Sequence, residues 1–595
     1  RFSHTHSHFP SRTDALSMEL PSCLLAGALP KWKLNTALVT VANATDGSIV
    51  QSLSEECSNC TWRSLCTITR KRTALLIDSL YPTQLRIVHD GIPSCQINAI
   101  LHNRGQYVLD SASCSLDIFE EGDGTLWTSL LAIFGLIFLL FSHDLYLHFK
   151  SGWWSAQEDH DEYYFGNIPR YRSTRRLLSV SVFRGLCVCF MAFANSHGGG
   201  LAQFQHSSWD GITVADLIFP AFLFCAGLSS QIAMAQLSCT TVDWKRLLNR
   251  LIYLCLIGIF IVNKGDDWRT FRIMGVLQRL ALCQLIVYPM QVKVNQPQTL
   301  LRITRKLRRF GAETTEEHPD EYDVIDGEEP ENNQIVEPII EGEYATYFSH
   351  YCGEWMQIGF VYWVTMLLAI VSSLLPFFFG APGCPPGYLG PGGVGDEGAF
   401  ANCTGGLAGW VDRWVLGRHI YDNAPVKRVY GGLDIDPEGI MGTFNAAILV
   451  AAGVLAGQIL RWYPFRSEQY TRLIVYGTLH FAVGLLLHKF LIPANKQLWS
   501  ISFSLITAGF SLFLCCFCRL AIDHVKTKIK WRALAYVGDN ALLIYVFQEA
   551  FSNRLPYEFF VGFSSIPRVL LSLWTVFVSL FLGFLLRHFD IKFKL

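Results

Sequence analysis

Charged residues are scarce in this sequence. Asp, Glu, Lys and Arg make up only 16% of its 595 residues, and hydrophobic residues make up 51%, whereas about 25% of the residues of soluble domains are charged. The net charge of −1 lacks the positive excess that proteins use to bind nucleic-acid phosphates. A signal peptide is not evident either, because the apolar core of residues 17–30 is too weak. The composition favours a polytopic α-helical membrane protein and gives no indication of nucleic-acid binding.

Long apolar runs are what the sequence has instead. A helix needs about 17 to 25 apolar residues to cross the hydrocarbon core of a bilayer. Eleven runs meet this requirement, and they predict about eleven transmembrane helices at 125–148, 178–195, 213–236, 247–263, 272–292, 355–378, 439–460, 470–490, 499–522, 535–552 and 565–586. The lipid bilayer is therefore an expected partner.

Positive charges and glycosylation sequons predict the orientation. Clusters of Lys and Arg precede the second run and follow the third and fifth, and cytoplasmic loops are enriched in these residues. Counting the predicted spans places the sequons at Asn43, Asn59 and Asn402 on the other side of the membrane from these Lys and Arg clusters. N-glycans are added only in the secretory lumen. The expected topology has a lumenal N-terminus and a cytosolic C-terminus.

Cysteines follow the same division. Seven of the 18 cysteines lie at 33–120 and 379–438, which the topology places in the lumen, where disulfides persist; they are Cys57, Cys60, Cys66, Cys95, Cys114, Cys384 and Cys403. We expect structural disulfides among them. Because seven is odd, one is expected to be free or paired between molecules. Bridges to Cys384 or Cys403 would tie the N-terminal region to the transmembrane part.

The spans and loops predict five parts. Residues 1–32 form a leader-like or disordered segment, and short alternating runs at 33–120 predict a small β-rich lumenal domain. A first transmembrane part covers 121–310, with an active-site loop at 195–216. Residues 311–350 are strongly acidic, which favours a disordered cytosolic loop. A second transmembrane part covers 351–595 and carries a lumenal loop at 379–438.

The loop between the second and third spans carries the best candidates for chemistry. His206 can exchange a proton near neutral pH or act as a nucleophile. Asn195 ends the second span and Asp216 lies one turn into the third, where polar groups are costly and usually functional. Glycines 198–200 permit close approach of the backbone to a ligand. A structural role for Asp216 is as well supported by the sequence as a catalytic one.

Several motifs also carry a resemblance. The strings FANSHGGG (193–200), QHSSWDGITVADLIFPAFLF (205–224), RIMGVLQRLA (272–281), DPEGIMGTFNA (436–446) and IPANKQLWSISF (492–503) resemble the heparan-alpha-glucosaminide N-acetyltransferase family in wording and order. The resemblance covers about 120–595.

The resemblance implies a lysosomal membrane enzyme that transfers acetyl from cytosolic acetyl-CoA to the non-reducing terminal glucosamine of heparan sulfate in the lumen. The family's active-site histidine falls on His206 and its nearby asparagine on Asn195. His206 would act either as a general base or as a transient acetyl carrier. No metal is expected, and a homodimer is expected by resemblance alone.

Further residues are candidates for binding the two substrates. Arg184, Gln278 and Arg279 are candidates for binding acetyl-CoA, although the arginines could instead snorkel to the interface or pair with carboxylates. Asp434, Asp436 and Glu438 could hold a cationic amino sugar. Their alternative role is to cap the following helix and complement its dipole.

The sequence departs from the family pattern at one position, and two other functions are alternatives. Relatives usually carry an Asp where this chain has Ser181, which leaves room for a divergent or inactive homologue. A secondary transporter of a small polar or sugar solute would also place polar groups in membrane helices, although no inverted repeat is visible. A divergent O-acyltransferase is the alternative within the enzyme class.

Overall fold

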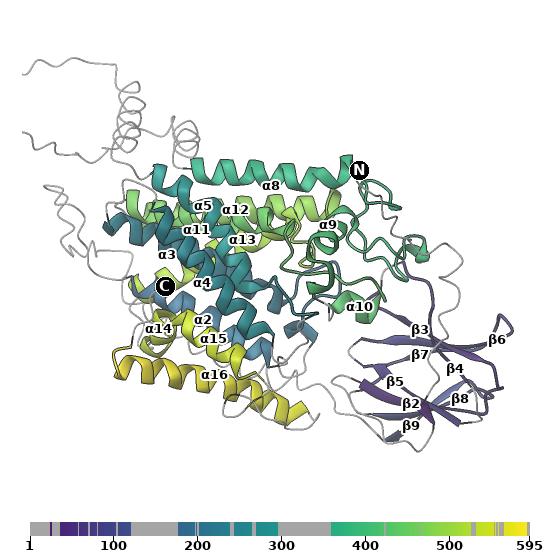
Figure 1. Ribbon diagram of the computed structural model, residues 1–595. Helices are drawn as coiled ribbons and strands as arrows, with labels where there is room; N and C mark the ends of the chain where they lie inside the picture. Colours follow the sequence, from purple (N-terminus) through teal and green to yellow (C-terminus); the bar gives the residue numbers. More distant parts are fainter. Residues whose placement is uncertain are drawn as a thin grey trace, which may run out of the picture.

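The computed structural model of the chain is mostly helical, with a β region near the N-terminus (Figure 1). It describes residues 24–25, 36–57, 59–68, 72–79, 81–102, 105–120, 177–196, 198, 202–237, 243–263, 269–294, 359–421, 424–463, 466–524, 531–552, 554, 557 and 565–591. The predicted first span at 125–148 and the predicted acidic loop at 311–350 lie outside these residues.

The β region consists of two sheets. The strands are β1 (Leu24–Leu25), β2 (Thr36–Ala42), β3 (Ile49–Ser54), β4 (Arg63–Thr67), β5 (Arg72–Asp78), β6 (Thr83–His89), β7 (Ile92–Ala99), β8 (Gln106–Asp110) and β9 (Ser115–Glu120). One sheet has the order β1-β5-β2-β8-β9 and the other β4-β3-β6-β7. In β6, buried Thr83, Leu85 and Ile87 alternate with half-buried residues, which is the period of a strand with one face on a core. The predicted β-rich region is confirmed.

The remainder is a bundle of helices. They are α2 (Leu178–Asn195), α3 (Val214–Leu237), α4 (Trp244–Val262), α5 (Val276–Val294), α8 (Phe360–Phe378), α9 (Gly406–Leu416), α10 (Pro425–Val429), α11 (Gly442–Trp462), α12 (Arg466–Phe490), α13 (Ile501–Cys518), α14 (Arg532–Asp539), α15 (Ala541–Ala550) and α16 (Ser565–His588). The short turns are η3 (Ala202–Phe204), η5 (Asp396–Gly398), η6 (Gly417–His419) and the π-helical η7 (Arg519–His524).

Within the described residues, seven helices are long and apolar enough to cross a membrane: α2, α3, α8, α11, α12, α13 with η7, and α16. The membrane class is confirmed, but the count of eleven is not. Helices α4 and α5 form at their predicted places, although α4 begins with three cations at Lys245, Arg246 and Arg250. The run at 535–552 does not form one helix, because α14 ends at Asp539 and α15 begins at Ala541.

Helices α3 and α11 form the centre of the bundle. A Cβ on Gly227 would overlap the carbonyl oxygen of Val450, and one on Gly453 would overlap that of Phe224. Small residues let helix backbones approach this closely in membrane proteins. By contrast, only 33% of α8, 28% of α12 and 39% of α16 is buried over their apolar windows. Their exposed apolar faces suit contact with lipid.

The β region lies beside the loops at one end of the bundle, near α10 (Figure 1). Arg428 Nε lies 3.0 Å from Asp78 Oδ2, and Thr61 N donates to the Val394 carbonyl at 3.0 Å. These contacts hold the two parts together.

The disulfides have a different pattern from the one expected. The pairs are Cys57–Cys60, Cys95–Cys114 and Cys384–Cys403, and Cys66 is also disulfide-bonded. None of the seven is therefore free, and Cys384 and Cys403 bond to each other rather than to the β region. Both of those expectations were wrong, whereas structural disulfides are confirmed. The free cysteines among the described residues all lie in helices α2, α3, α4, α5 and α13.

Candidate functional site

The site is a cavity of about 440 Å³ where the helix ends nearest the β region converge. It is lined by the last turn of α2, the loop before α3, the end of α4, the start of α5, and segments that precede α11 and α13 and follow α15. The predicted topology gives all these ends to one side of the membrane. Charged and titratable groups of the lining include His206, Arg272, Glu438, Lys496 and Glu549.

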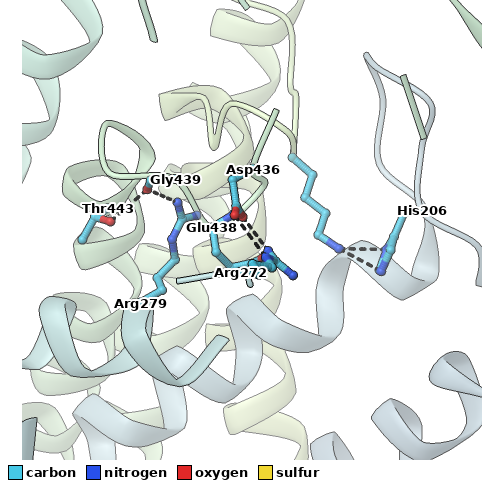
Figure 2. Close-up of polar contacts among 8 residues, drawn as sticks. His206, Arg272, Arg279, Asp436, Glu438, Gly439 and Thr443 are labelled. Carbon is cyan, nitrogen blue, oxygen red and sulfur yellow. Dashed lines mark hydrogen bonds and ion pairs between the residues drawn. The ribbon is translucent and has the colours of Figure 1, made fainter. Parts of the chain in front are cut away.

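His206 contacts a carboxylate and an ammonium group. Its Nδ1 lies 2.8 Å from Asp216 Oδ1, and Lys496 Nζ lies 2.8 Å from Nδ1 and 3.1 Å from Nε2. Lys496 Nζ is also 3.4 Å from Asp216 Oδ1. Figure 2 shows His206 to one side of the Arg272–Asp436–Glu438 group.

Asp216 fixes this arrangement. Its side chain is 0% exposed, and its Oδ2 accepts hydrogen bonds from Ser207 N at 3.2 Å and from Thr213 N and Oγ1 at 3.1 and 2.9 Å. Three donors, a nearby ammonium and the N-terminus of α3 all favour the ionised carboxylate. A proton on Nδ1 would be donated to the ionised Oδ1, which leaves Nε2 as the acceptor. The ammonium of Lys496 lies close to both ring nitrogens.

Asn195 also lines the cavity, at the end of α2. Its Nδ2 donates to Glu549 Oε1 at 3.0 Å, and both residues line the cavity with His206. The structure therefore brings two of the three predicted catalytic residues, Asn195 and His206, to one cavity. The third, Asp216, lies behind His206.

The predicted substrate-binding acids are largely paired. Arg272 donates to both oxygens of Asp436, at 3.1 and 2.5 Å, and to Glu438 Oε2 at 2.6 Å. Burial alone would lower the pKa of Arg272, but the charges of Glu438 and Asp436 raise it above its ordinary value. Glu438 lines the cavity, whereas Asp434 does not and is bound to Lys427 at 2.6 Å. The Arg272 group builds a wall of the cavity, and Glu438 is the acid that faces it.

Comparison with known proteins identifies similar sequences. No protein-family model matches the chain. It is 32% identical over 407 residues to heparan-alpha-glucosaminide N-acetyltransferase of Mus musculus, across 65% of this chain and 56% of the relative. For that of Homo sapiens the identity is 32% over 403 residues, across 64% and 54%.

The chain is similar to the heparan-alpha-glucosaminide N-acetyltransferases. This confirms the resemblance read from the motifs. The aligned part is little more than half the length of these two relatives.

The residues predicted to bind the donor of such an N-acetyltransferase do not line the cavity. Arg279 is fully buried, donates to the Gly439 carbonyl at 2.6 Å and stacks over Trp499 at 4.7 Å; Figure 2 shows it on the other side of Arg272 from His206. Gln278 donates to the Cys255 carbonyl at 3.2 Å. Arg184 is half-buried within α2. Contact of these three residues with acetyl-CoA stays a prediction.

The departure from the N-acetyltransferase pattern at Ser181 has a local counterpart. Ser181 Oγ donates to Asp539 Oδ1 at 2.8 Å, so α14 supplies a carboxylate beside Ser181. The Asp539 carboxylate therefore lies beside a residue that is one turn before Arg184 in α2.

Arg272, Lys496 and Glu549 were not predicted from the sequence as site residues. Arg272 and Lys496 stand inside two of the motifs that carry the N-acetyltransferase resemblance, which was a usable signal. Nothing in the sequence around Glu549 distinguishes it from a glutamate at a helix end. Its role emerges only where α15 meets Asn195.

The predicted glycosylation sites Asn43, Asn59 and Asn402 are all exposed. Asn43 donates to Asp110 Oδ1 at 3.0 Å. Exposure is required for a glycan, and their modification stays a prediction. Among the residues that the structure describes, no group of three or more His, Cys, Asp or Glu could hold a metal ion.

Proposed function

We propose that the chain is a lysosomal membrane N-acetyltransferase that moves acetyl from cytosolic acetyl-CoA to the terminal α-glucosamine of heparan sulfate in the lumen. The N-terminus is lumenal and the C-terminus cytosolic in this proposal. The observation that carries it is His206 on the cavity wall, oriented by a buried, ionised Asp216. The name and 32% identity of the two relatives support the acyltransferase class.

His206 acts through Nε2. Because Asp216 accepts a hydrogen bond from the Nδ1–H group, the lone pair of Nε2 can accept a proton from the amine of glucosamine, as in other carboxylate-oriented histidines. The amine nitrogen forms a bond to the thioester carbonyl carbon, the carbon–sulfur bond breaks, and the departing thiolate takes up a proton. The side chain of His206 is 44% exposed, so substrate can reach it.

Lys496 acts beside His206. An incoming amine displaces Lys496 from Nε2, while the 3.4 Å contact with Asp216 keeps its ammonium in place. From there it can donate to the oxygen of the reacting carbonyl as negative charge develops. Its side chain is only 8% exposed, which strengthens such an interaction because water screens it little.

The acceptor sugar fits the polar part of the lining. Gln497 Oε1 and Gln548 Oε1 are buried acceptors with no hydrogen-bond partner among the described residues, and both residues line the cavity. Unsatisfied buried acceptors are costly, and sugar hydroxyls would satisfy them. Glu438 and Glu549 add negative charge that favours an ammonium group.

The acetyl donor fits the apolar part of the lining of the same cavity. Ile218, Phe219, Ile261, Val262 and Val276 line the cavity from α3, α4 and α5, and these walls suit the thin acyl-bearing arm of acetyl-CoA. Arg184, Gln278 and Arg279 remain proposed contacts for the rest of the donor. A general base and an acetyl carrier would both use Nε2, and an acetyl group on His206 after exposure to acetyl-CoA alone would distinguish the carrier.

The test is vectorial transfer in proteoliposomes. Labelled acetyl-CoA is supplied outside and glucosamine is enclosed inside. We expect N-acetylglucosamine to accumulate inside while free CoA appears outside, and no product in protein-free liposomes. Movement of glucosamine without acetylation would contradict the proposal and indicate a transporter; acetylation of a hydroxyl instead of the amine would indicate an O-acyltransferase.

A further inference from the structure

A second cavity, of about 630 Å³, lies between the β region and the loop that contains α10. The β region contributes residues of β3, β4 and β5 and the turns beside them, and the loop contributes Val394, Ala424 and the 427–429 stretch of α10. Within the residues that the structure describes, this cavity shares no lining residue with the cavity of His206.

Most of the charged residues that line this second cavity are cations. Its charged lining residues are Arg63, Asp78, Lys427 and Arg428, three cations against one carboxylate. Arg63 donates Nη1 to the Arg428 carbonyl at 2.6 Å and has no carboxylate partner in the described part of the chain. Excess positive charge in a concave site attracts anions and concentrates them.

The acids bound to the other two cations are replaceable. Arg428 pairs with Asp78 at 3.0 Å, with 42% and 33% of the side chains exposed. Lys427 pairs with Asp434 at 2.6 Å, with 50% and 37% exposed. Exposed ion pairs of this kind contribute little to stability. A sulfate or carboxylate of a ligand can therefore take the place of either acid.

The two cavities are neighbours. Pro425 lines the cavity of His206 and the adjacent Ala424 lines the second, so the start of α10 separates them. Helix α10 has five residues, a length of about 8 Å. Trp209, three residues after His206, packs in one cluster with Ala424, Val426 and the half-buried Cys57 and Cys60. A chain of sugars that passed the start of α10 would have its terminal residue in the first cavity and the preceding residues in the second.

We propose that the second cavity is a subsite for the sulfate and carboxylate groups of the sugars that precede the terminal residue, with Arg63, Lys427 and Arg428 as the binding cations. This rests on the proposed function, since it assumes a polyanionic oligosaccharide whose end reaches His206. Arginine suits this role because its planar fork forms paired, charge-assisted hydrogen bonds with oxyanions.

The test compares three acceptors: a sulfated heparan-type tetrasaccharide with a terminal glucosamine, its desulfated counterpart and free glucosamine. The variant is Arg63→Gln with Arg428→Gln. We expect the KM for the sulfated tetrasaccharide to rise at least tenfold, because two charge-assisted contacts are lost. We expect kcat and the parameters for free glucosamine to stay unchanged.

Two controls separate binding from docking of the β region. Asp78→Asn breaks the same ion pair as Arg428→Gln but keeps the cations, so its KM for the sulfated tetrasaccharide should be equal or lower. Arg418→Gln removes an exposed cation of the same loop that lies outside the cavity and should change nothing. A matching rise of KM in Asp78→Asn would overturn the proposal, because it would show that docking rather than cation contact is responsible.

Direct binding of the labelled sulfated tetrasaccharide, measured by fluorescence anisotropy without acetyl-CoA, separates failure of this proposal from failure of the proposed function. Loss of binding in the double variant supports the subsite even if no acceptor is acetylated. Equal binding by wild type and double variant, or equal binding of the sulfated and desulfated forms, would overturn it.

Discussion

Asp216 is the residue on which the chemistry at His206 depends. A buried carboxylate is costly unless it is paired and hydrogen-bonded, and Asp216 has the Ser207 and Thr213 donors together with Lys496 and His206. From the sequence, a structural and a catalytic role of Asp216 were equally well supported. The geometry gives it both, because the capping of α3 and the orientation of the imidazole use different oxygens of one carboxylate.

Replacement of Asp216 by Asn should separate these roles. The amide keeps an acceptor for the Thr213 donors but loses the charge that holds the proton on Nδ1 and pairs with Lys496. We expect kcat to fall by about 10²–10⁴ with a much smaller change in KM, measured as acetyl transfer to glucosamine. Asp243→Asn, at the exposed N-cap of α4, is the matched control, and a wild-type kcat for Asp216→Asn would contradict the assignment.

Asp412 provides a pH dependence of stability. Burial raises its pKa from 3.8 to about 6, although Ile440 N donates to it. The folded state therefore binds the proton more tightly than the unfolded state. The contribution to stability is complete below pH 3.8 and is lost as the pH rises through 6. Between pH 5 and 7 the loss is on the order of 1 kcal/mol.

We therefore expect the melting temperature of the wild type to fall more between pH 5 and 7 than that of Asp412→Asn, in which no proton is exchanged. The measurement is thermal unfolding in detergent followed by intrinsic fluorescence. An identical pH dependence in both proteins would show that Asp412 is not the responsible group.

At the scale of elements, the sequence predicted best where one helix carries its own signal. The ends of α2, α3, α8 and α16 lie within a few residues of the predicted spans, because long apolar runs specify them directly. The break at Asn540 was not predicted, because α14 and α15 share one apolar run. The contact of Asn195 with Glu549 was not predictable, since it depends on how α15 meets α2.

The crossing of α3 and α11 gives an element-scale prediction. Gly453→Ala should destabilise the fold by about 1–3 kcal/mol or more, because its new methyl group meets the Phe224 carbonyl and forces the helices apart. Alanine is otherwise the better helix former, so a loss can only come from the contact. Ala233→Leu, at an exposed position of α3, should be neutral in the same thermal unfolding assay; a Gly453→Ala protein as stable as the wild type would contradict the close crossing.

At the scale of the whole molecule, the predicted topology can be tested at helix α4. Helices α4 and α5 form where spans were predicted but fall outside the seven strongly apolar helices. Cysteines introduced at Asp243 and Thr270, on either side of α4, should react with a membrane-impermeant maleimide from opposite faces of sealed vesicles. Labelling of both from the same face would show that α4 does not cross. Background labelling is subtracted with the unmodified chain.

The relation between the β region and the bundle was the least predictable feature at this scale. Composition and strand patterns predicted that a β region exists. Its docking on the helices, however, depends on single contacts, such as the ion pair of Asp78 with Arg428 and the hydrogen bond from Ser208 to Glu56 at 3.0 Å. Residues hundreds of positions apart make these contacts, and no local pattern specifies them. The same docking places the His206 loop between the β region and the helices.

The most direct test of the central claim is acetyl transfer by His206→Ala, measured with labelled acetyl-CoA and glucosamine on purified protein in detergent, together with acetyl-CoA binding. His588→Ala, at the exposed end of α16, is the matched control. We predict that His206→Ala binds acetyl-CoA and unfolds at the wild-type temperature. Its rate of acetyl transfer should be lower than that of the wild type by a factor of about a thousand or more. Transfer at the wild-type rate by His206→Ala would contradict the claim that His206 carries the chemistry.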